Sequence, residues 1–324
     1  MFDIFAARLK QGFRTGAYPR VPPELPDRFR GLPVLDSSRC PDGCFACAQA
    51  CPTDAIHPAP GGLSVDLGRC LFCSDCMRSC PVGAISHSTD HRLATRSRQD
   101  LLLREGQGLA RASALDEKMR RLFGRSLKLR QVSAGGCNAC EADINVLGTV
   151  VFDLGRFGIQ VVASPRHADG LLITGPVTAN MQLALKKTYD AVPAPKIVIA
   201  VGACAISGGP YVGHPEVVGG ADGVVPVDLY IPGCPPHPYT ILDGLLRLLG
   251  RLERDETTTA SWSDRLRAAA VETGEANIRE VAQAGRTRAN EAVKYLGASF
   301  DDERATSATS GDGAPERRGA GKEP

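Results

Sequence analysis

Short apolar runs alternate with segments of helical spacing through the middle of the chain. Runs rich in β-branched residues, of a length typical of buried strands, recur from residue 127 onward. The predicted strands cover residues 127–132, 159–163, 170–174, 196–201 and 227–231. Helices are predicted to begin between them, at about Ala139, Thr178 and Tyr239. Strands that alternate with helices predict an α/β domain with a parallel sheet, which we place at residues 127–252.

The first 39 residues have a different pattern. Four apolar residues share one face of a predicted short amphipathic helix: Phe2, Phe5, Leu9 and Phe13. We expect this face to pack on a partner or on the chain's own core. Residues 18–33 are rich in Pro and Arg, which predicts an extended segment. Residues 1–39 are therefore interpreted as an N-terminal arm.

Residues 40–85 repeat themselves with a period of 29 residues. Three cysteines of the first copy, Cys44, Cys47 and Cys51, recur as Cys73, Cys76 and Cys80. In both copies the last cysteine precedes a proline. Residues 55–67 alternate around a Pro-Gly-Gly sequence, which predicts a β-hairpin. Cys40 and Cys70 are 30 positions apart, so the first copy carries one inserted residue.

The remaining segments carry charge but little apolar periodicity. Eleven Lys or Arg residues and five Asp or Glu residues lie between Thr89 and Arg130, and we interpret residues 88–126 as a basic, broken-helical linker with a solvated charged face. Residues 253–297 are predicted to form a helical extension. Residues 298–324 have almost no apolar residues, which predicts a disordered tail.

Composition limits the function classes. The chain has 324 residues and a net charge of +2, which argues against nucleic acid as a partner because nucleic-acid-binding domains usually carry a marked basic excess. The longest apolar run, residues 197–206, is too short to cross a bilayer. No cleavable leader opens the chain, so we expect a location in the cytoplasm. Twelve cysteines in that reducing compartment favour metal or cluster binding over disulfides.

The repeat has the spacing of a ferredoxin with two 4Fe-4S clusters. Residues 70–81 read Cys-x2-Cys-x2-Cys-x3-Cys-Pro, the bacterial ferredoxin run, in which the fourth cysteine ligates the other cluster. One predicted ligand set is therefore Cys51, Cys70, Cys73 and Cys76. The other is Cys40, Cys44, Cys47 and Cys80, where the inserted residue leaves a 3Fe or altered cluster open. These residues predict an α+β dicluster ferredoxin-like domain at 40–87.

Four further cysteines belong to the α/β domain: Cys137, Cys140, Cys204 and Cys234. Each follows a predicted strand, so all four are expected to meet at the carboxyl edge of the sheet, where α/β proteins bind ligands. Glycines beside them, including Gly202, Gly209 and Gly233, would let the backbone approach closely. We interpret this set as the ligands of a third 4Fe-4S cluster.

Several motifs carry a family resemblance. They are Gly136-Cys137-Asn138-Ala139-Cys140-Glu141, Pro165-Arg166-His167-Ala168-Asp169, Gly202-Ala203-Cys204 and Ile231-Pro232-Gly233-Cys234-Pro235-Pro236. Together they resemble the small subunit of group 4 membrane-bound nickel-iron hydrogenases, such as formate hydrogenlyase, a family homologous to the cluster-bearing small subunit of complex I. The N-terminal 87 residues are similar to the ferredoxin-like subunit of the same complexes. The resemblance implies a fusion of two subunits that are usually separate.

The resemblance also implies a function and partners. It implies an electron-transfer subunit without catalytic residues of its own, at the cytoplasmic side of the membrane and held there by other subunits. The implied partners are a hydrogenase-like large subunit, membrane-arm subunits and an upstream redox donor. Glu141 and Asp143, beside the third cysteine set, are expected to face the active site of the large subunit.

Two other functions stay open. The equivalent subunit of a complex I-like quinone oxidoreductase is one alternative, although that family has two adjacent cysteines where this chain has Cys137-x2-Cys140, a spacing that favours the hydrogenases. The other alternative is a zinc-stabilised assembly protein, because closely spaced cysteines also bind structural zinc.

Overall fold

The computed structural model describes residues 14–59 and 62–252, together with Ile4, Ala6 and Ala7. The predicted amphipathic helix falls almost entirely outside these residues. The predicted helical extension and tail also lie outside them. Residues up to Glu253 form one compact unit, which contains all twelve cysteines.

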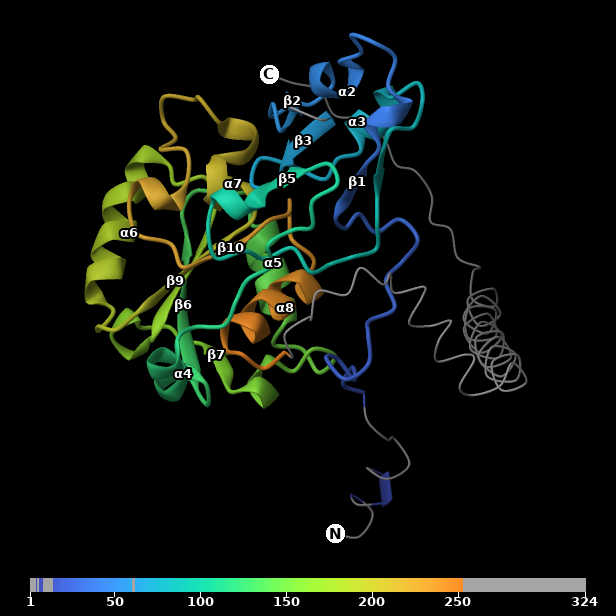
Figure 1. Ribbon diagram of the computed structural model, residues 1–324. Helices are drawn as coiled ribbons and strands as arrows, with labels where there is room; N and C mark the ends of the chain where they lie inside the picture. Colours follow the sequence, from blue (N-terminus) through green and yellow to red (C-terminus); the bar gives the residue numbers. More distant parts are fainter. Residues whose placement is uncertain (1–3, 5, 8–13, 60–61, 253–324) are drawn as a thin grey trace, which may run out of the picture. The chain divides into compact units, whose positions relative to one another are not determined.

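A five-stranded parallel sheet forms the centre of the α/β domain, residues 127–252 (Figure 1). Its strands, in spatial order, are β10 (Leu229–Ile231), β9 (Ile197–Val201), β8 (Gly170–Thr174), β6 (Leu127–Ser133) and β7 (Ile159–Val161). They correspond to the five strands predicted from the sequence, and every neighbouring pair runs parallel. The predicted parallel sheet is confirmed.

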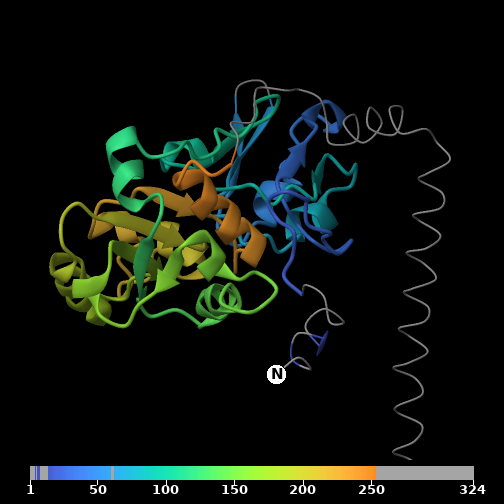
Figure 2. The same ribbon diagram turned by 90° about the horizontal axis from the view of Figure 1, so that it is seen from below.

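Helices cover both faces of this sheet (Figures 1 and 2). One buried core joins alternate strand residues such as Leu171 and Ile173 to α6 (Ala179–Ala191) and α7 (Ala203–Ser207). A second core joins the strand residues that point to the other face of the sheet, such as Leu172, to α5 (Ala139–Val146) and α8 (Pro238–Leu248). Burial on both faces explains why the strands read as continuous apolar runs. The helices predicted to begin near 139, 178 and 239 correspond to α5, α6 and α8.

The cysteine-rich module, residues 33–104, is built from the 29-residue repeat. Helix α2 (Ala46–Gln49) and helix α3 (Asp75–Ser79) begin 29 positions apart, as do strands β2 (Ile56–Ala59) and β4 (Ile85–His87). Strand β4 pairs antiparallel with β1 (Pro33–Leu35), and β2 pairs antiparallel with β3 (Gly62–Asp66), as the predicted hairpin requires. The sequence repeat is thus a structural repeat, with the two short helices packed together.

The prediction of a helical linker at 88–126 is wrong for most of its length. The segment contains a 3-10 turn (Gln99–Leu101), one α-helix, α4 (Glu117–Phe123), and strand β5 (Leu102–Arg104), which pairs with β3. The pattern misled because several of its arginines are not on a solvated helical face. Arg96 donates to the carbonyl of Asp228 at 2.7 Å, and Arg98 pairs with Asp66.

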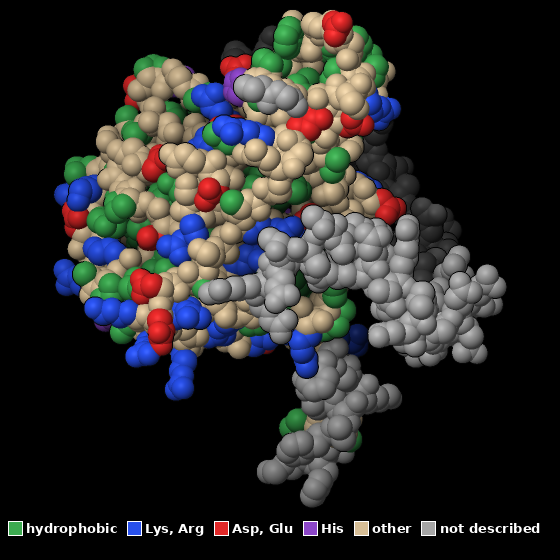
Figure 3. All heavy atoms as spheres, viewed as in Figure 1, with side chains coloured by type: hydrophobic (Ala, Val, Ile, Leu, Met, Phe, Trp, Pro, Cys, Tyr) green, Lys and Arg blue, Asp and Glu red, His purple; other side chains and the backbone are tan. Residues whose placement is uncertain are grey.

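Basic side chains do reach solvent at the end of that segment. Lys and Arg gather along the lower part of the face seen in Figure 3. Arg125, between α4 and β6, and Lys128, in β6, are exposed, whereas Arg92 and Arg111 are half-buried in ion pairs with Asp90. The basic residues of this segment therefore have two roles: some form ion pairs within the protein, and others carry surface charge.

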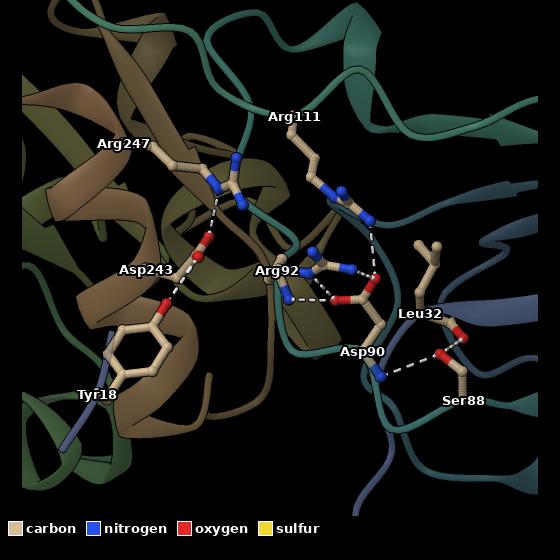
Figure 4. A network of polar contacts seen from close by, with 8 residues as sticks. All are labelled: Tyr18, Leu32, Ser88, Asp90, Arg92, Arg111, Asp243 and Arg247. Atoms are coloured by element: carbon tan, nitrogen blue, oxygen red, sulfur yellow. Dashed lines mark hydrogen bonds and ion pairs between the residues drawn. The ribbon is translucent and has the colours of Figure 1, made fainter. Parts of the chain in front are cut away.

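Polar contacts connect the N-terminal arm, the cysteine-rich module and the α/β domain (Figure 4). Tyr18 of the arm bonds to Asp243 of α8 at 2.8 Å. The amide of Asp90, just beyond β4, donates to the hydroxyl of Ser88, which donates to the carbonyl of Leu32. Thr95 forms an antiparallel bridge with Tyr230 of β10. Among the described residues, no helix is long and apolar enough to cross a membrane.

Candidate functional site

The twelve cysteines are all free and fall into three groups of four. The groups are the three ligand sets that the cysteine spacing predicts; within each set, after burial, neighbouring thiols contribute to raised pKa values. The first group is Cys40, Cys44, Cys47 and Cys80. The second group is Cys51, Cys70, Cys73 and Cys76. The third group is Cys137, Cys140, Cys204 and Cys234. These are the sets that the spacing predicts, and the partition stays a prediction.

The last cysteine of each repeat copy sits in the same backbone turn. The amide of Ala55 donates to Sγ of Cys51 at 3.2 Å, and the amide of Ala84 donates to Sγ of Cys80 at 3.1 Å. Both turns contain a residue of positive φ at the equivalent position, Asp54 and Gly83. Burial opposes ionisation of Cys80, but the backbone amides that follow it outweigh burial and lower its pKa. The turn at Cys80 therefore favours a thiolate.

The second group lines a pocket. All four of its cysteines contribute to the wall, with Pro33, Val65 and Phe72 among the apolar neighbours. Burial raises the pKa of Cys70 to about 12 and that of Cys76 to about 11, and the charges of neighbouring thiols add to the effect. Buried thiols such as Cys70 and Cys76 favour the neutral form until a positive centre compensates for the buried charge.

The third group gathers at the carboxyl edge of the sheet. Cys137 follows β6, Cys140 lies in the first turn of α5, Cys204 lies in α7 after β9, and Cys234 follows β10. Burial first, then the charges of Cys234 and Cys137, raises the pKa of Cys204 to about 12. Parallel strands bring these four positions to one edge because their carboxyl ends coincide.

Two glycines allow the backbone to approach this third group. A Cβ on Gly202 would lie 2.6 Å from Sγ of Cys140, and Gly202 has a φ of +91°. A Cβ on Gly209 would lie 2.7 Å from Sγ of Cys204, also at positive φ. The close approach expected at these glycines is therefore present, and any other residue would push into a cysteine sulfur.

Some thiols of different groups influence one another, although burial is the largest cause of each raised pKa. The charge of Cys47, from the first group, contributes to the raised pKa of Cys76 in the second. The charge of Cys73, from the second group, contributes to the raised pKa of Cys234 in the third. Cys137 and Cys234 of the third group are exposed, so this group reaches the surface.

The expectation that Glu141 faces a partner is wrong. Its side chain is only 6% exposed, and Oε1 accepts a hydrogen bond of 2.7 Å from the hydroxyl of Thr174 at the end of β8. Burial opposes ionisation of Glu141, but hydrogen bonds from Ser133 and Thr174 lower its pKa. Glu141 therefore joins α5 to the sheet edge. Asp143 is half-buried, and burial raises its pKa.

Sequence reasoning missed one polar residue beside the cysteines, Thr53. Thr53 is 2% exposed and donates to the carbonyl of Arg69 at 2.8 Å, which ties the Cys51 turn to the residue before Cys70. His237 begins α8, where Nδ1 accepts from the amide of Tyr239 at 3.2 Å. A polar residue directly after the Cys-Pro pair was the only sequence signal for Thr53.

Iron–sulfur clusters are bound by four cysteine thiolates, because sulfur is a soft ligand. Backbone amides that point toward the sulfurs stabilise the cluster further. The first two groups meet this requirement through the Ala55, Phe72 and Ala84 amides, each of which donates to a cysteine sulfur. In the third group, the backbone of Gly202 and Gly209 approaches the sulfurs of Cys140 and Cys204 closely. The residues present therefore fit such a group.

Comparison with known proteins agrees with this chemistry. Residues 137–248 match the family described as "NADH ubiquinone oxidoreductase, 20 Kd subunit". The chain is 42% identical over 134 residues to the "Probable membrane-bound hydrogenase subunit mbhJ" of Pyrococcus furiosus, covering 41% of this chain and 80% of that protein. The chain belongs to the 20 Kd subunit family. Residues 63–86 of this family member match a second model, "4Fe-4S binding domain".

Other relatives of this 20 Kd subunit family member come from two kinds of complex. It is 49% identical over 130 residues to formate hydrogenlyase subunit 7 of Escherichia coli, covering 40% of this chain and 51% of that protein. It is 48% identical over 114 residues to an NADH-quinone oxidoreductase subunit of Clostridium beijerinckii, covering 35% of this chain and 68% of that protein. The chain thus joins a 4Fe-4S binding domain to a 20 Kd subunit domain, and its relatives are subunits of oxidoreductase complexes.

Proposed function

We propose that the chain is an electron-transfer subunit that holds three 4Fe-4S clusters, one in each cysteine group. Residues 40–87 would hold the first two clusters and residues 127–252 the third. When bound, such clusters accept and donate single electrons, at potentials that their ligands and surroundings set. The chain's own cysteines and backbone amides would hold the clusters.

The observation that carries the proposal is that the second cysteine group lines one pocket and that the third follows parallel strands to one edge of the sheet. The order of the three groups in a series is part of the proposal. Cys47 and Cys76 connect the first group to the second, and Cys73 and Cys234 connect the second to the third. A protein that only needed structural metal would gain nothing from such an order. A relay needs it, because each centre must lie near the next.

The two ends of the series suggest where partners bind. The exposed Cys137 and Cys234 place the third group at a surface that a second subunit can cover. The names of the relatives, which include hydrogenase subunits, favour a catalytic large subunit of a membrane-associated nickel-iron hydrogenase as that partner. The first group, at the other end, would exchange electrons with an upstream redox donor. Membrane-arm subunits would hold the assembly at the cytoplasmic side of the membrane.

A quinone oxidoreductase complex is the second candidate. Its support is the 48% identity to a subunit of an NADH-quinone oxidoreductase. The two candidates share the three clusters and differ in the large subunit. The Cys137-x2-Cys140 spacing favours the hydrogenase.

Metal analysis of the purified complex tests the proposal. We expect iron and acid-labile sulfide in about equal amounts, at about twelve atoms of each per chain, together with nickel, and hydrogen evolution from a reduced viologen dye. Full iron content without nickel, with quinone reductase activity, would favour the second candidate. Zinc without sulfide would exclude both and leave the zinc-stabilised assembly protein.

A further inference from the structure

A tight turn leads into Cys70 of the second group. The carbonyl of Asp66 accepts hydrogen bonds from the amides of Arg69 and Cys70, at 3.1 Å and 3.0 Å. Oδ1 of Asp66 accepts from the amide of Gly68 at 2.9 Å. One residue therefore closes the turn from both its backbone and its side chain, which leaves the carbonyl of Gly68 directed away from the turn.

That carbonyl meets the helix of the third group. The hydroxyl of Ser207, in α7, lies 2.9 Å from the carbonyl oxygen of Gly68 and is 139 positions away in the sequence. Ser207 is 8% exposed, so this bond is shielded from water. Its hydroxyl also lies 3.1 Å from the carbonyl of Ala203, one helical turn back in α7.

The contact is too close for a side chain. A Cβ on Gly68 would lie 2.7 Å from Cγ2 of Ile206 and 2.9 Å from Cζ of Arg98. Contacts of this length do not occur for real Cβ atoms, so the side chains of Ile206 and Arg98, which hold this turn, would have to shift. Gly68 is not among the glycines with a positive φ. It is therefore required here for space and not for its backbone conformation.

Arg98 fixes the turn from its other side. Its guanidinium makes two parallel hydrogen bonds to the Asp66 carboxylate, at 2.8 Å and 2.6 Å. The side chains of Arg98 and Asp66 are 24% and 9% exposed. A bidentate pair of this kind sets orientation as well as attraction, so the Asp66 carboxylate cannot rotate away from Gly68.

We propose that Ser207, Gly68 and the Asp66–Arg98 pair form a clamp that fixes the separation of the second and third clusters. Cys70 lies two residues after Gly68, and Cys204 lies three residues before Ser207, so the hydrogen bond joins a ligand loop of each cluster by a short bonded route. The clamp rests on the proposed function. Its residues position the cysteines and do not bind the clusters themselves.

Two properties depend on this separation. Electron transfer between buried centres and the magnetic interaction between two reduced clusters both weaken steeply as the centres move apart. Neither property depends on how strongly each cluster is held by its own four cysteines. A clamp residue can therefore be recognised by changes in coupling that occur without loss of iron.

The test uses the full chain with its clusters, and iron and sulfide are counted before each measurement. In Ser207→Ala, we expect unchanged cluster content, a weaker spin–spin interaction between the two clusters in the EPR spectrum of the reduced protein, and electron transfer between them slowed several-fold. Gly68→Ala should produce the same change in larger degree. Thr188→Ala is the matched control, because its hydroxyl also donates to a helical carbonyl, that of Ala184 at 2.7 Å, far from the clamp.

The outcomes separate the clamp from the function on which it rests. Three clusters with an unchanged spin–spin interaction in both Ser207→Ala and Gly68→Ala would overturn the clamp and leave the proposed function standing. A wild-type chain without a third cluster would overturn both. An equal loss of coupling in Thr188→Ala would show that the effect is not local, and would also overturn the clamp.

Discussion

The hydroxyl of Tyr18 donates a hydrogen bond of 2.8 Å to Oδ1 of Asp243, across 225 positions of sequence. The other carboxylate oxygen accepts from Nε of Arg247 at 2.8 Å, one turn further along α8 (Figure 4). Burial, then the charge of Asp243, raises the pKa of Tyr18, so the phenol remains a donor at any physiological pH. Arg156 adds hydrogen bonds to the carbonyls of Gly16 and Tyr18. The N-terminal arm is thereby fixed to the α/β domain.

Removing this hydroxyl should destabilise the fold. Tyr18→Phe leaves a buried carboxylate oxygen without its partner, which costs about 1–3 kcal/mol for a group of this kind. Denaturant unfolding of the variant should show that loss in the free energy of unfolding. Tyr211→Phe is the control, because that side chain is 47% exposed. Equal stability of the two variants would show that the Tyr18 bond contributes nothing.

Much of this architecture follows from local sequence, because strands buried on both faces need continuous apolar runs and a duplicated module repeats its cysteines. Strand β5 was missed because it has three residues, of which only Leu103 is buried. Glu141 was misplaced because an acidic residue in the first turn of a helix usually faces solvent. The bond between Gly68 and Ser207 could not be predicted, since it joins two positions that no local pattern relates.

The cysteine partition can be tested with paired substitutions. If Cys51 and Cys73 hold the same cluster, the double variant Cys51→Ser, Cys73→Ser should lose about four iron atoms, no more than either single variant. If Cys80 belongs to the first group, Cys80→Ser, Cys73→Ser should lose about eight. Iron analysis and EPR of folded protein give the count. The reverse result would mean that each repeat copy holds its own cluster.

The third group should be sensitive to the size of residue 202. Gly202→Ala places a methyl group against Sγ of Cys140, where its Cβ would lie at 2.6 Å, so we expect loss of about one cluster. Gly213→Ala is a matched control, because Gly213 has a φ of +81° but nothing within 4 Å of its Cβ. Both variants bear a backbone strain of about 1–2 kcal/mol. Only the first should lose iron, and equal iron in both would refute the role of the close contact.

The hydrogen bond between Glu141 and Thr174 leads to a prediction about stability and its dependence on pH. Glu141→Gln and Thr174→Val should each destabilise the fold by about 1–3 kcal/mol, and a double-mutant cycle should show a coupling of about 0.5–3 kcal/mol because the two groups share one bond.

The pKa of Glu141 is lowered in the folded state, so the ionised form is the one that folding favours. Its contribution should be complete above the ordinary pKa of a glutamate and should disappear as the pH falls through the lower folded-state value. The difference in unfolding free energy between the wild-type chain and Glu141→Gln should therefore shrink below about pH 4. Unfolding measured from neutral pH downward follows this difference. If Glu141 instead carried protons for a partner, Glu141→Gln would abolish hydrogen evolution by the complex without changing the unfolding free energy at neutral pH.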